Sequence, residues 1–184
     1  MKAYAVDPST QTIEEIDIEM KANTTYTFFK SILIDELATL NQHTIYADAN
    51  ALSEKKKGFF IGEQLVMGVA LVSGQNGLEE HDVSIPQEDL RKLITFNLND
   101  FYTEVLDILS ATEINLYSPF AVEQGEETLS LSPEWAIFTF NLADDKTKEY
   151  FITELKKVID AKEDVLAFMQ KMSQLAIKAA GQEV

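Results

Sequence analysis

A chain of 184 residues, of which 46% are hydrophobic, can form one domain or two small ones around an ordered core, which excludes wholesale disorder. The absence of cysteine excludes disulfides, thiolate catalysis and cysteine-bound zinc. The net charge of −16, from 31 acidic and 15 basic residues, argues against direct binding of nucleic acid or of anionic membranes, because both are polyanions.

The sequence contains no membrane-spanning or secretory signal. No stretch approaches the roughly 18 consecutive apolar residues of a membrane helix. The first residues reach Asp7 before an apolar signal region could form. We therefore expect a cytoplasmic protein without membrane contacts.

The first 40 residues predict a hairpin followed by a helix. Alternating apolar residues lie on either side of a turn that contains Pro8, namely Ala3, Ala5, Ile13, Ile16 and Ile18. This alternation predicts two paired strands. Residues 24–40 then carry apolar side chains at helical spacing, which predicts one helix packed on a sheet. These side chains are Tyr26, Phe29, Ile32, Leu33, Leu37 and Leu40.

Further strands are predicted between residues 44 and 77. Residues 44–47 are strand-like, and a basic turn leads to a strand at 59–61. A break at 62–64 and a strand at 65–72 complete a second hairpin. The glycine-containing turn at 74–77 ends it.

Several short runs in the first half of the chain carry a resemblance to a known family. They are Met1-Lys2-Ala3-Tyr4 with Asp7-Pro8, Ile45-Tyr46-Ala47-Asp48 with Leu52, Phe59-Phe60-Ile61-Gly62, and Gly68-Val69-Ala70-Leu71-Val72. A polar helix from Ser84-Ile85-Pro86 through Leu90-Arg91 and a closing strand at Thr95-Phe96 follow them. Together these runs resemble a domain of unknown function found largely in phage, plasmid and other mobile-element proteins, over about residues 1–96. The resemblance implies that biological setting and no particular activity.

The second half predicts a helix followed by short strands. Asn99 is a candidate N-cap for a helix that extends to Leu109, with Asp100 placed favourably in its first turn. A polar loop at 123–127 separates the first two strands. The predicted strands are 114–117, 128–131 and 135–140.

Two amphipathic helices are predicted to close the chain. Asp145 is expected to cap the first, and Asp160 with Glu163 forms a carboxylate version of the capping box before the second, which ends near Gly181. The expected buried stripe of the first is Tyr150, Phe151, Leu155, Val158 and Ile159. The second has a broad apolar surface, which packs on the first or forms a homodimer interface. It comprises Leu166, Phe168, Met169, Met172 and Leu175.

These elements predict an α+β fold. The N-terminal part should be a mainly antiparallel sheet with a packed helix, and the rest a small β segment and two C-terminal helices. We expect an N-terminal α+β domain at residues 1–96 and a C-terminal α+β region at 97–184. The two could share one core, because no proline or glycine linker separates them.

No motif for catalysis, phosphate binding or metal binding is present. The nucleophile elbow, the Walker pattern and the dinucleotide fingerprint are missing. His43 and His81 are interpreted as surface residues rather than as catalytic bases. The spacing of the carboxylates provides no calcium loop. We therefore expect no metal, no cofactor and, on balance, no catalysis.

The leading hypothesis is a noncatalytic accessory protein of a phage or mobile element that binds a protein partner through an acidic surface. Residues 93–145 contain ten acidic residues and no lysine or arginine. Such a surface fits a basic protein, including one that binds nucleic acid, although acidity also serves solubility alone. The candidate contacts are Asp100, Glu104, Asp107, Glu113, Glu123, Glu126 and Glu127.

Two other classes of function stay open. An enzyme or small-ligand domain would need a pocket in which carboxylates and tyrosines converge, and Tyr46, Asp48 and Glu63 are the candidates. A structural or assembly component would use the C-terminal helices to form a homodimer.

Overall fold

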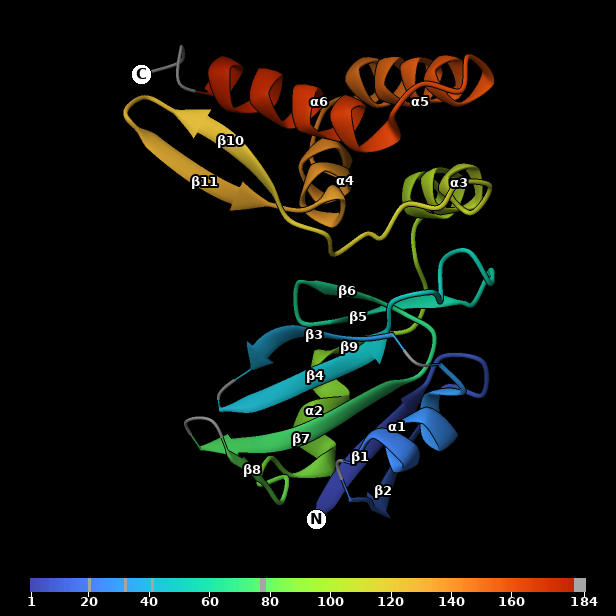
Figure 1. Cartoon of the computed structure of the whole chain (residues 1–184), viewed down its shortest axis with the longest axis vertical. Helices are drawn as coiled ribbons and strands as arrows, with labels where there is room; N and C mark the ends of the chain where they lie inside the picture. The colour runs from blue at the N-terminus through green and yellow to red at the C-terminus, as the bar shows by residue number, and fades with distance from the viewer. Residues whose placement is uncertain (20, 32, 41, 77–78, 181–184) are drawn as a thin grey trace. The chain divides into compact units, whose positions relative to one another are not determined.

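A computed structural model of the chain describes residues 1–19, 21–31, 33–40, 42–76 and 79–180. Contacts between Cα atoms divide the chain into two compact units, Met1–Leu98 and Asn99–Val184. Each unit contains helices and antiparallel strands, which confirms the α+β class (Figure 1).

The first unit is built on a six-stranded antiparallel sheet with the order β2-β1-β7-β4-β3, in which β8 also pairs with β7. The predicted N-terminal hairpin forms the β1–β2 edge of this sheet and is confirmed. The strands are β1 (Lys2–Asp7), β2 (Thr12–Asp17), β3 (Ile34–Leu40), β4 (His43–Asp48), β7 (Ala70–Asn76) and β8 (Glu79–His81).

The predicted helix over residues 24–40 is wrong in its second half. Helix α1 (Ala22–Phe29) ends at Lys30, which adopts the left-handed conformation with φ 56°, and its N–H donates to the Tyr26 carbonyl. The chain then forms β3, which pairs with β4. Pairing with a distant strand overrides local apolar spacing, because that spacing carries no information about partners far away in the sequence.

A second, three-stranded sheet has the order β6-β5-β9. Strands β5 (Gly58–Ile61) and β6 (Gln64–Met67) form the predicted hairpin, and helix α2 (Gln87–Leu93) leads into β9 (Ile94–Thr95). The predicted strand 65–72 is instead divided at Gly68, which has φ 75°. Left-handed backbone there turns the chain from one sheet into the other.

The large sheet is covered on both faces. Successive residues of a strand point to opposite faces. Leu71 accordingly packs with Phe29 of α1 on one face, whereas Val72 packs with Phe59 and Leu90 on the other. Helix α2 and the small sheet thus lie on the face opposite α1.

The second unit combines helices with one hairpin. Its elements are α3 (Asp100–Leu109), β10 (Phe120–Gln124), β11 (Glu127–Leu131), α4 (Pro133–Asn141), α5 (Asp145–Asp160) and α6 (Val165–Ala180). Its core includes a cluster of rings around the fully buried Phe151, which stacks on Phe140 at 4.5 Å between ring centroids. Among the described helices of the chain, none is both long and apolar enough to cross a membrane.

Two strand predictions in this unit are wrong. Residues 135–140 belong to α4, which Ser132 caps and which has Pro133 in its first turn. A continuous apolar run has no clear period, so it fits a buried helix as well as a strand. Residues 114–117 form a loop, and the strand that pairs with β11 is β10.

The helix starts were predicted with mixed success. Asn99 caps α3 as predicted, since its side chain accepts from the Tyr102 N–H. Asp144, rather than Asp145, caps α5. Asp164 accepts from the backbone N–H groups at the start of α6, in place of the predicted capping box at 160–163. The predicted stop at residue 181 lies outside the described residues.

Candidate functional site

The seven predicted acidic contacts lie in the second unit and do not form one patch. Asp100, Glu104 and Asp107 lie on the exposed face of α3, at the spacing i, i+4 and i+7. Glu104 is also bound by Lys156, with 2.8 Å between Oε1 and Nζ. The charge of Lys156 therefore neutralises part of the acidic face of α3.

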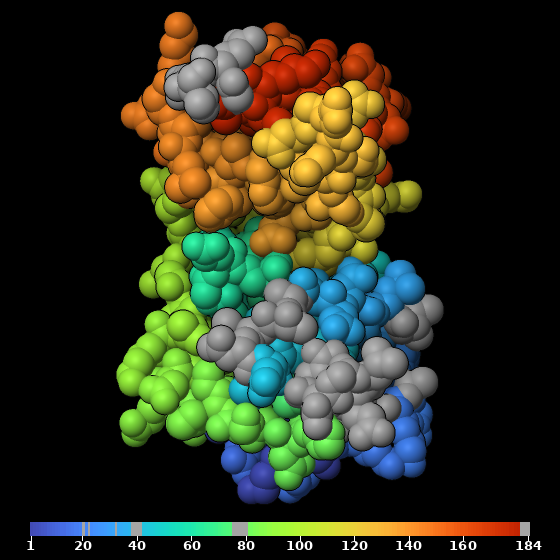
Figure 2. Space-filling model, turned by 90° about the vertical axis from the view of Figure 1, so that its left-hand side faces the viewer, coloured from blue at the N-terminus to red at the C-terminus, as the bar shows by residue number. Residues whose placement is uncertain are grey.

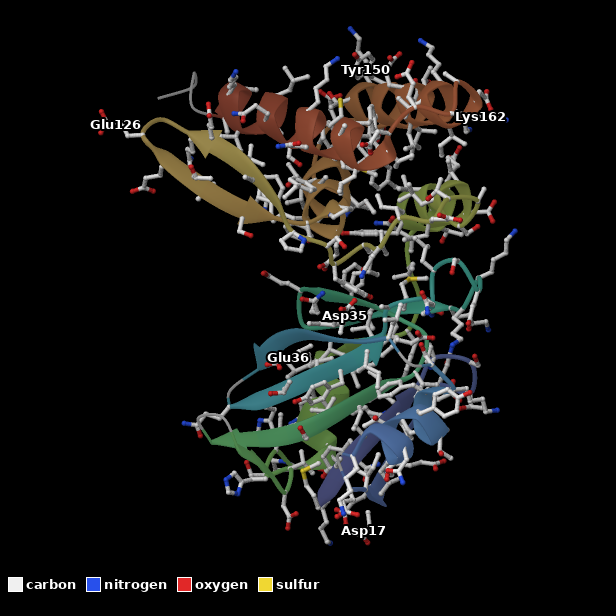
Figure 3. The ribbon with its side chains drawn as sticks, in the orientation of Figure 1. Asp17, Asp35, Glu36, Glu126, Tyr150 and Lys162 are labelled. Atoms are coloured by element: carbon white, nitrogen blue, oxygen red, sulfur yellow. The ribbon has the colours of Figure 1, made fainter. Side chains whose placement is uncertain are left out.

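A second acidic group, which we call the hairpin tip, comprises Glu123, Glu126 and Glu127. Gly125 (φ 62°) and Glu126 form the two-residue turn between β10 and β11, where a glycine accommodates the positive φ. All three glutamates are exposed, and none has an ion-pair partner among the residues that the structure describes. Glu126 extends away from the end of the hairpin (Figure 3). The hairpin lies at the surface of its unit (Figure 2).

Glu113, the seventh acid, lines a cavity of about 690 Å³ between the loop after α3 and the turn from α5 to α6. The lining has mixed charge, because Glu113, Lys162 and Glu163 all contribute to it. Its apolar lining comes from Ile114, Ile159, Val165 and Leu166. The volume falls within the range of small-molecule sites.

A groove of about 420 Å³ lies between α5 and α6. Tyr150, which was predicted to be buried, lines this groove with 54% of its surface exposed, and Leu175 is 49% exposed. Phe168 and Met172 contribute buried apolar surface. The groove therefore leaves part of the apolar face of the helical pair accessible.

The structure does not bring Tyr46, Asp48 and Glu63 together. Tyr46 packs against the apolar cluster under α1, and Asp48 follows on the same face of β4. Glu63 lies in the exposed turn between β5 and β6, in the sheet that covers the opposite face. The three residues therefore line no common pocket.

Asp48 instead forms a buried ion pair. Only 2% of it is exposed, and its Oδ2 lies 2.6 Å from Lys56 Nζ, while its Oδ1 accepts from the Asn50 N–H at 2.9 Å. Burial alone would raise the pKa of this carboxyl. Hydrogen bonds from Lys56, Ser31 and Asn50 outweigh that effect and lower the pKa below its ordinary value of 3.8. The pair anchors the loop after β4.

His43 was predicted to be on the surface and is 3% exposed. Its Nε2 accepts hydrogen bonds from the N–H groups of Ser84 and Ile85, each at 3.1 Å, and lies 3.1 Å from Ser84 Oγ. A serine beside a histidine suggests nucleophilic chemistry. Here two backbone donors already occupy the basic nitrogen, so the histidine holds the 84–85 segment in place. His81 is exposed.

Tyr102 carries the most strongly shifted pKa in the second unit. Burial, with a smaller contribution from the charge of Glu134, raises the pKa of its hydroxyl to about 12. A phenol with that pKa stays protonated at neutral pH and provides no base. Among the described residues, no three acidic or histidine side chains converge as metal ligands.

Two glutamines of α6 have a role that was not predicted. Gln170 Nε2 donates to the Ala121 carbonyl at 2.6 Å, and Gln174 exchanges two hydrogen bonds with the backbone of Glu123. These side chains bind the outer edge of β10 to α6. Their i, i+4 spacing places them on one helix face, which is the only sequence signal for this contact.

The chain was compared with protein-family models, with curated proteins and with solved structures, and no match was found in any of the three.

Proposed function

We propose that this protein is a noncatalytic accessory protein of a phage or other mobile element, and that it binds a basic protein partner through the hairpin tip. The observation that carries the proposal is the exposure of Glu123, Glu126 and Glu127 without ion-pair partners among the described residues. They belong to a segment, residues 93–145, that lacks lysine and arginine. The resemblance of residues 1–96 supports the biological setting.

Electrostatics explains why such a tip suits a basic partner. Carboxylates without neighbouring cations produce a negative potential that speeds and selects the encounter with a positive surface. The hairpin tip fulfils this condition better than α3, where Lys156 binds Glu104. Because exposed charges are screened by salt, the binding should weaken as ionic strength rises.

The use of two buried polar groups supports a proposal without catalysis. Asp48 is neutralised by Lys56, and His43 accepts from backbone donors. Both arrangements anchor loops of the first unit.

The test starts with capture of a partner on the immobilised protein from host lysate, elution by a salt gradient and identification by mass spectrometry. Binding of the purified partner is then measured with the triple variant Glu123→Gln, Glu126→Gln, Glu127→Gln. We expect this variant to bind about tenfold more weakly at low salt. The matched triple variant Asp100→Asn, Glu104→Gln, Asp107→Asn should lose much less. Binding that is insensitive to both salt and the first variant would overturn the proposal.

The groove between α5 and α6 favours a second candidate, a homodimer that uses the C-terminal helices. Tyr150 and Leu175 expose apolar surface along it. Burying such side chains between two copies would stabilise a dimer by the hydrophobic effect. Light scattering should then give twice the mass of one chain, and Tyr150→Ser with Leu175→Ser should restore the monomer.

A further inference from the structure

The open edges of the sheets differ in how they are protected against pairing with another chain. An edge strand presents unpaired N–H and C=O groups, and proteins protect such edges with charges, bulges, short strands or covering side chains. Strand β2 has two of these protections. Gln87 Nε2 donates to the Ile13 carbonyl at 2.5 Å, and Glu14, Glu15 and Asp17 place charges along the strand.

The outer edges of β3, β6 and β9 are protected as well. The register of β3 shifts between Glu36 and Ala38, as expected for a bulge, and Asp35 and Glu36 add charge. Strands β6 and β9 are only 4 and 2 residues long. None of these edges offers a long, uncharged row of backbone groups.

The hairpin of the second unit has one protected edge and one open edge. Ala121 and Glu123 direct backbone groups of β10 away from β11, toward Gln170 and Gln174. In an antiparallel pair, a residue whose N–H and C=O groups point away from the partner strand lies opposite a residue whose backbone groups also point away. The register pairs Ala121 with Ser130 and Glu123 with Thr128. The N–H and C=O groups of Thr128 and Ser130 therefore point outward from β11.

No residue in the described part of the chain gives the outer edge of β11 the protections seen elsewhere. Thr128 and Ser130 are exposed and uncharged, and no described residue forms a hydrogen bond with their outward backbone groups. Leu129 and Leu131 are only half-buried, although Val122 and Phe120 opposite them are buried. A third strand beside β11 would bond to the open groups and cover the two leucines.

We propose that β11 receives an extended basic segment of the protein partner as a third strand of the hairpin. This inference rests on the proposed function and specifies its mode of binding. Backbone hydrogen bonds from Thr128 and Ser130 would hold the segment, and alternate apolar side chains would pack beside Leu129 and Leu131. Lysines or arginines would lie near Glu126 and Glu127 at the hairpin tip.

A second copy of this chain is a less suitable occupant. Two hairpins placed edge to edge would bring together three glutamates from each copy, and strands β10 and β11 contain no cation to neutralise them. Like charges brought together oppose association, whereas a basic segment neutralises them.

The test uses the intact protein and a labelled synthetic peptide of about eight residues with alternating valine and lysine, a length typical of a strand with flanking residues. A peptide of alternating valine and glutamate is the control. We expect the basic peptide to bind and the acidic peptide not to bind. On binding, amide exchange at Thr128 and Ser130 should slow by about tenfold or more, since both N–H groups become hydrogen-bonded.

The matched variants are Ser130→Pro, which removes an outward N–H, and Ser130→Ala, which keeps it. We expect the proline variant to bind the peptide about tenfold more weakly and the alanine variant to bind it as the unmodified protein does. Thr128→Pro provides a second proline position. The exchange measurement needs no variant, so it stays decisive if a proline disturbs the hairpin.

The outcomes separate the mode of binding from the proposed function. Salt-sensitive binding that depends on the three tip glutamates, with unprotected Thr128 and Ser130 amides, would overturn strand addition and keep the acidic docking surface. No binding of the peptide together with no salt-sensitive partner would overturn both. A dimer that Ser130→Pro dissociates would assign the edge to a second copy and overturn the basic occupant.

Discussion

At the scale of single residues, the first unit depends on buried polar groups that hold its loops to the sheet. Asp48 binds Lys56 and the Asn50 N–H, and His43 binds the N–H groups of Ser84 and Ile85. A buried polar group is costly when it loses its partner. These residues should therefore be sensitive to substitution even though they are outside the proposed binding surface.

Asp48→Asn should lower the free energy of unfolding by about 2 kcal/mol at pH 7. Removing one partner of a buried ion pair typically costs about 3 to 5 kcal/mol. Here the loss is smaller, because the Lys56 side chain is 30% exposed and also binds Glu54. Urea unfolding measures this loss of stability. Glu54→Gln is the control, and it should lower the free energy of unfolding by less than about 1 kcal/mol, because exposed ion pairs contribute little.

The effect of Asp48→Asn should depend on pH. The folded-state pKa of Asp48 lies below its ordinary value of 3.8, so its ionised form stabilises the fold above that pH. This contribution is lost as pH falls through the lowered pKa. The difference in the free energy of unfolding between the unmodified protein and Asp48→Asn should therefore be largest at pH 7 and decrease in acid. A difference that stays constant down to pH 2 would contradict the ion-pair explanation.

At the scale of elements, helix α6 and the hairpin are held together by side-chain hydrogen bonds. The helix covers the outer edge of β10 through Gln170 and Gln174, and β11 stays open. A two-stranded hairpin alone is marginally stable in water. The helix therefore supports the strand pair that presents the proposed binding edge.

Gln170→Ala with Gln174→Ala should release the outer edge of β10 from α6. Three hydrogen bonds are lost, at about 1 kcal/mol each or less, so we expect a destabilisation of about 2 kcal/mol. The Glu123 amide, which donates to Gln174, should exchange about tenfold faster. Lys171→Ala, at an exposed position of the same helix, is the control and should leave this exchange rate unchanged.

At the scale of the whole molecule, each unit has apolar clusters of its own. One cluster of the first unit includes Phe59 and Val72, and the second unit has the rings around Phe151. Trp135, the single tryptophan, lies in α4 of the second unit. Its fluorescence therefore reports on that unit, whereas circular dichroism reports on both.

We expect urea unfolding to give different transitions by the two methods. If each core unfolds by itself, the fluorescence midpoint belongs to the second unit, and the circular dichroism curve contains two steps. Asp48→Asn should move one of these steps and leave the fluorescence midpoint where it was. If the fluorescence and circular dichroism curves coincide and Asp48→Asn shifts both, the two units unfold as a single cooperative unit instead.

Features that depend on neighbouring residues could be predicted from the sequence. The β1–β2 and β5–β6 hairpins follow from apolar runs around turn residues, and Asn99 caps α3 because an N-cap acts within one helical turn. The acidity of the hairpin tip is also a sequence property. Composition and local spacing are enough for such features, since the interacting groups are close along the chain.

Other features were decided by contacts between distant segments. The change from α1 to β3 after Phe29 depends on pairing with β4, and the burial of His43 depends on a loop that begins about forty residues later. The open edge of β11 exists because Gln170 and Gln174 cover β10 and leave the other strand free. Sequence patterns describe which face of a segment is apolar, but only the tertiary structure determines which segment packs against it, because that choice depends on long-range pairing and burial.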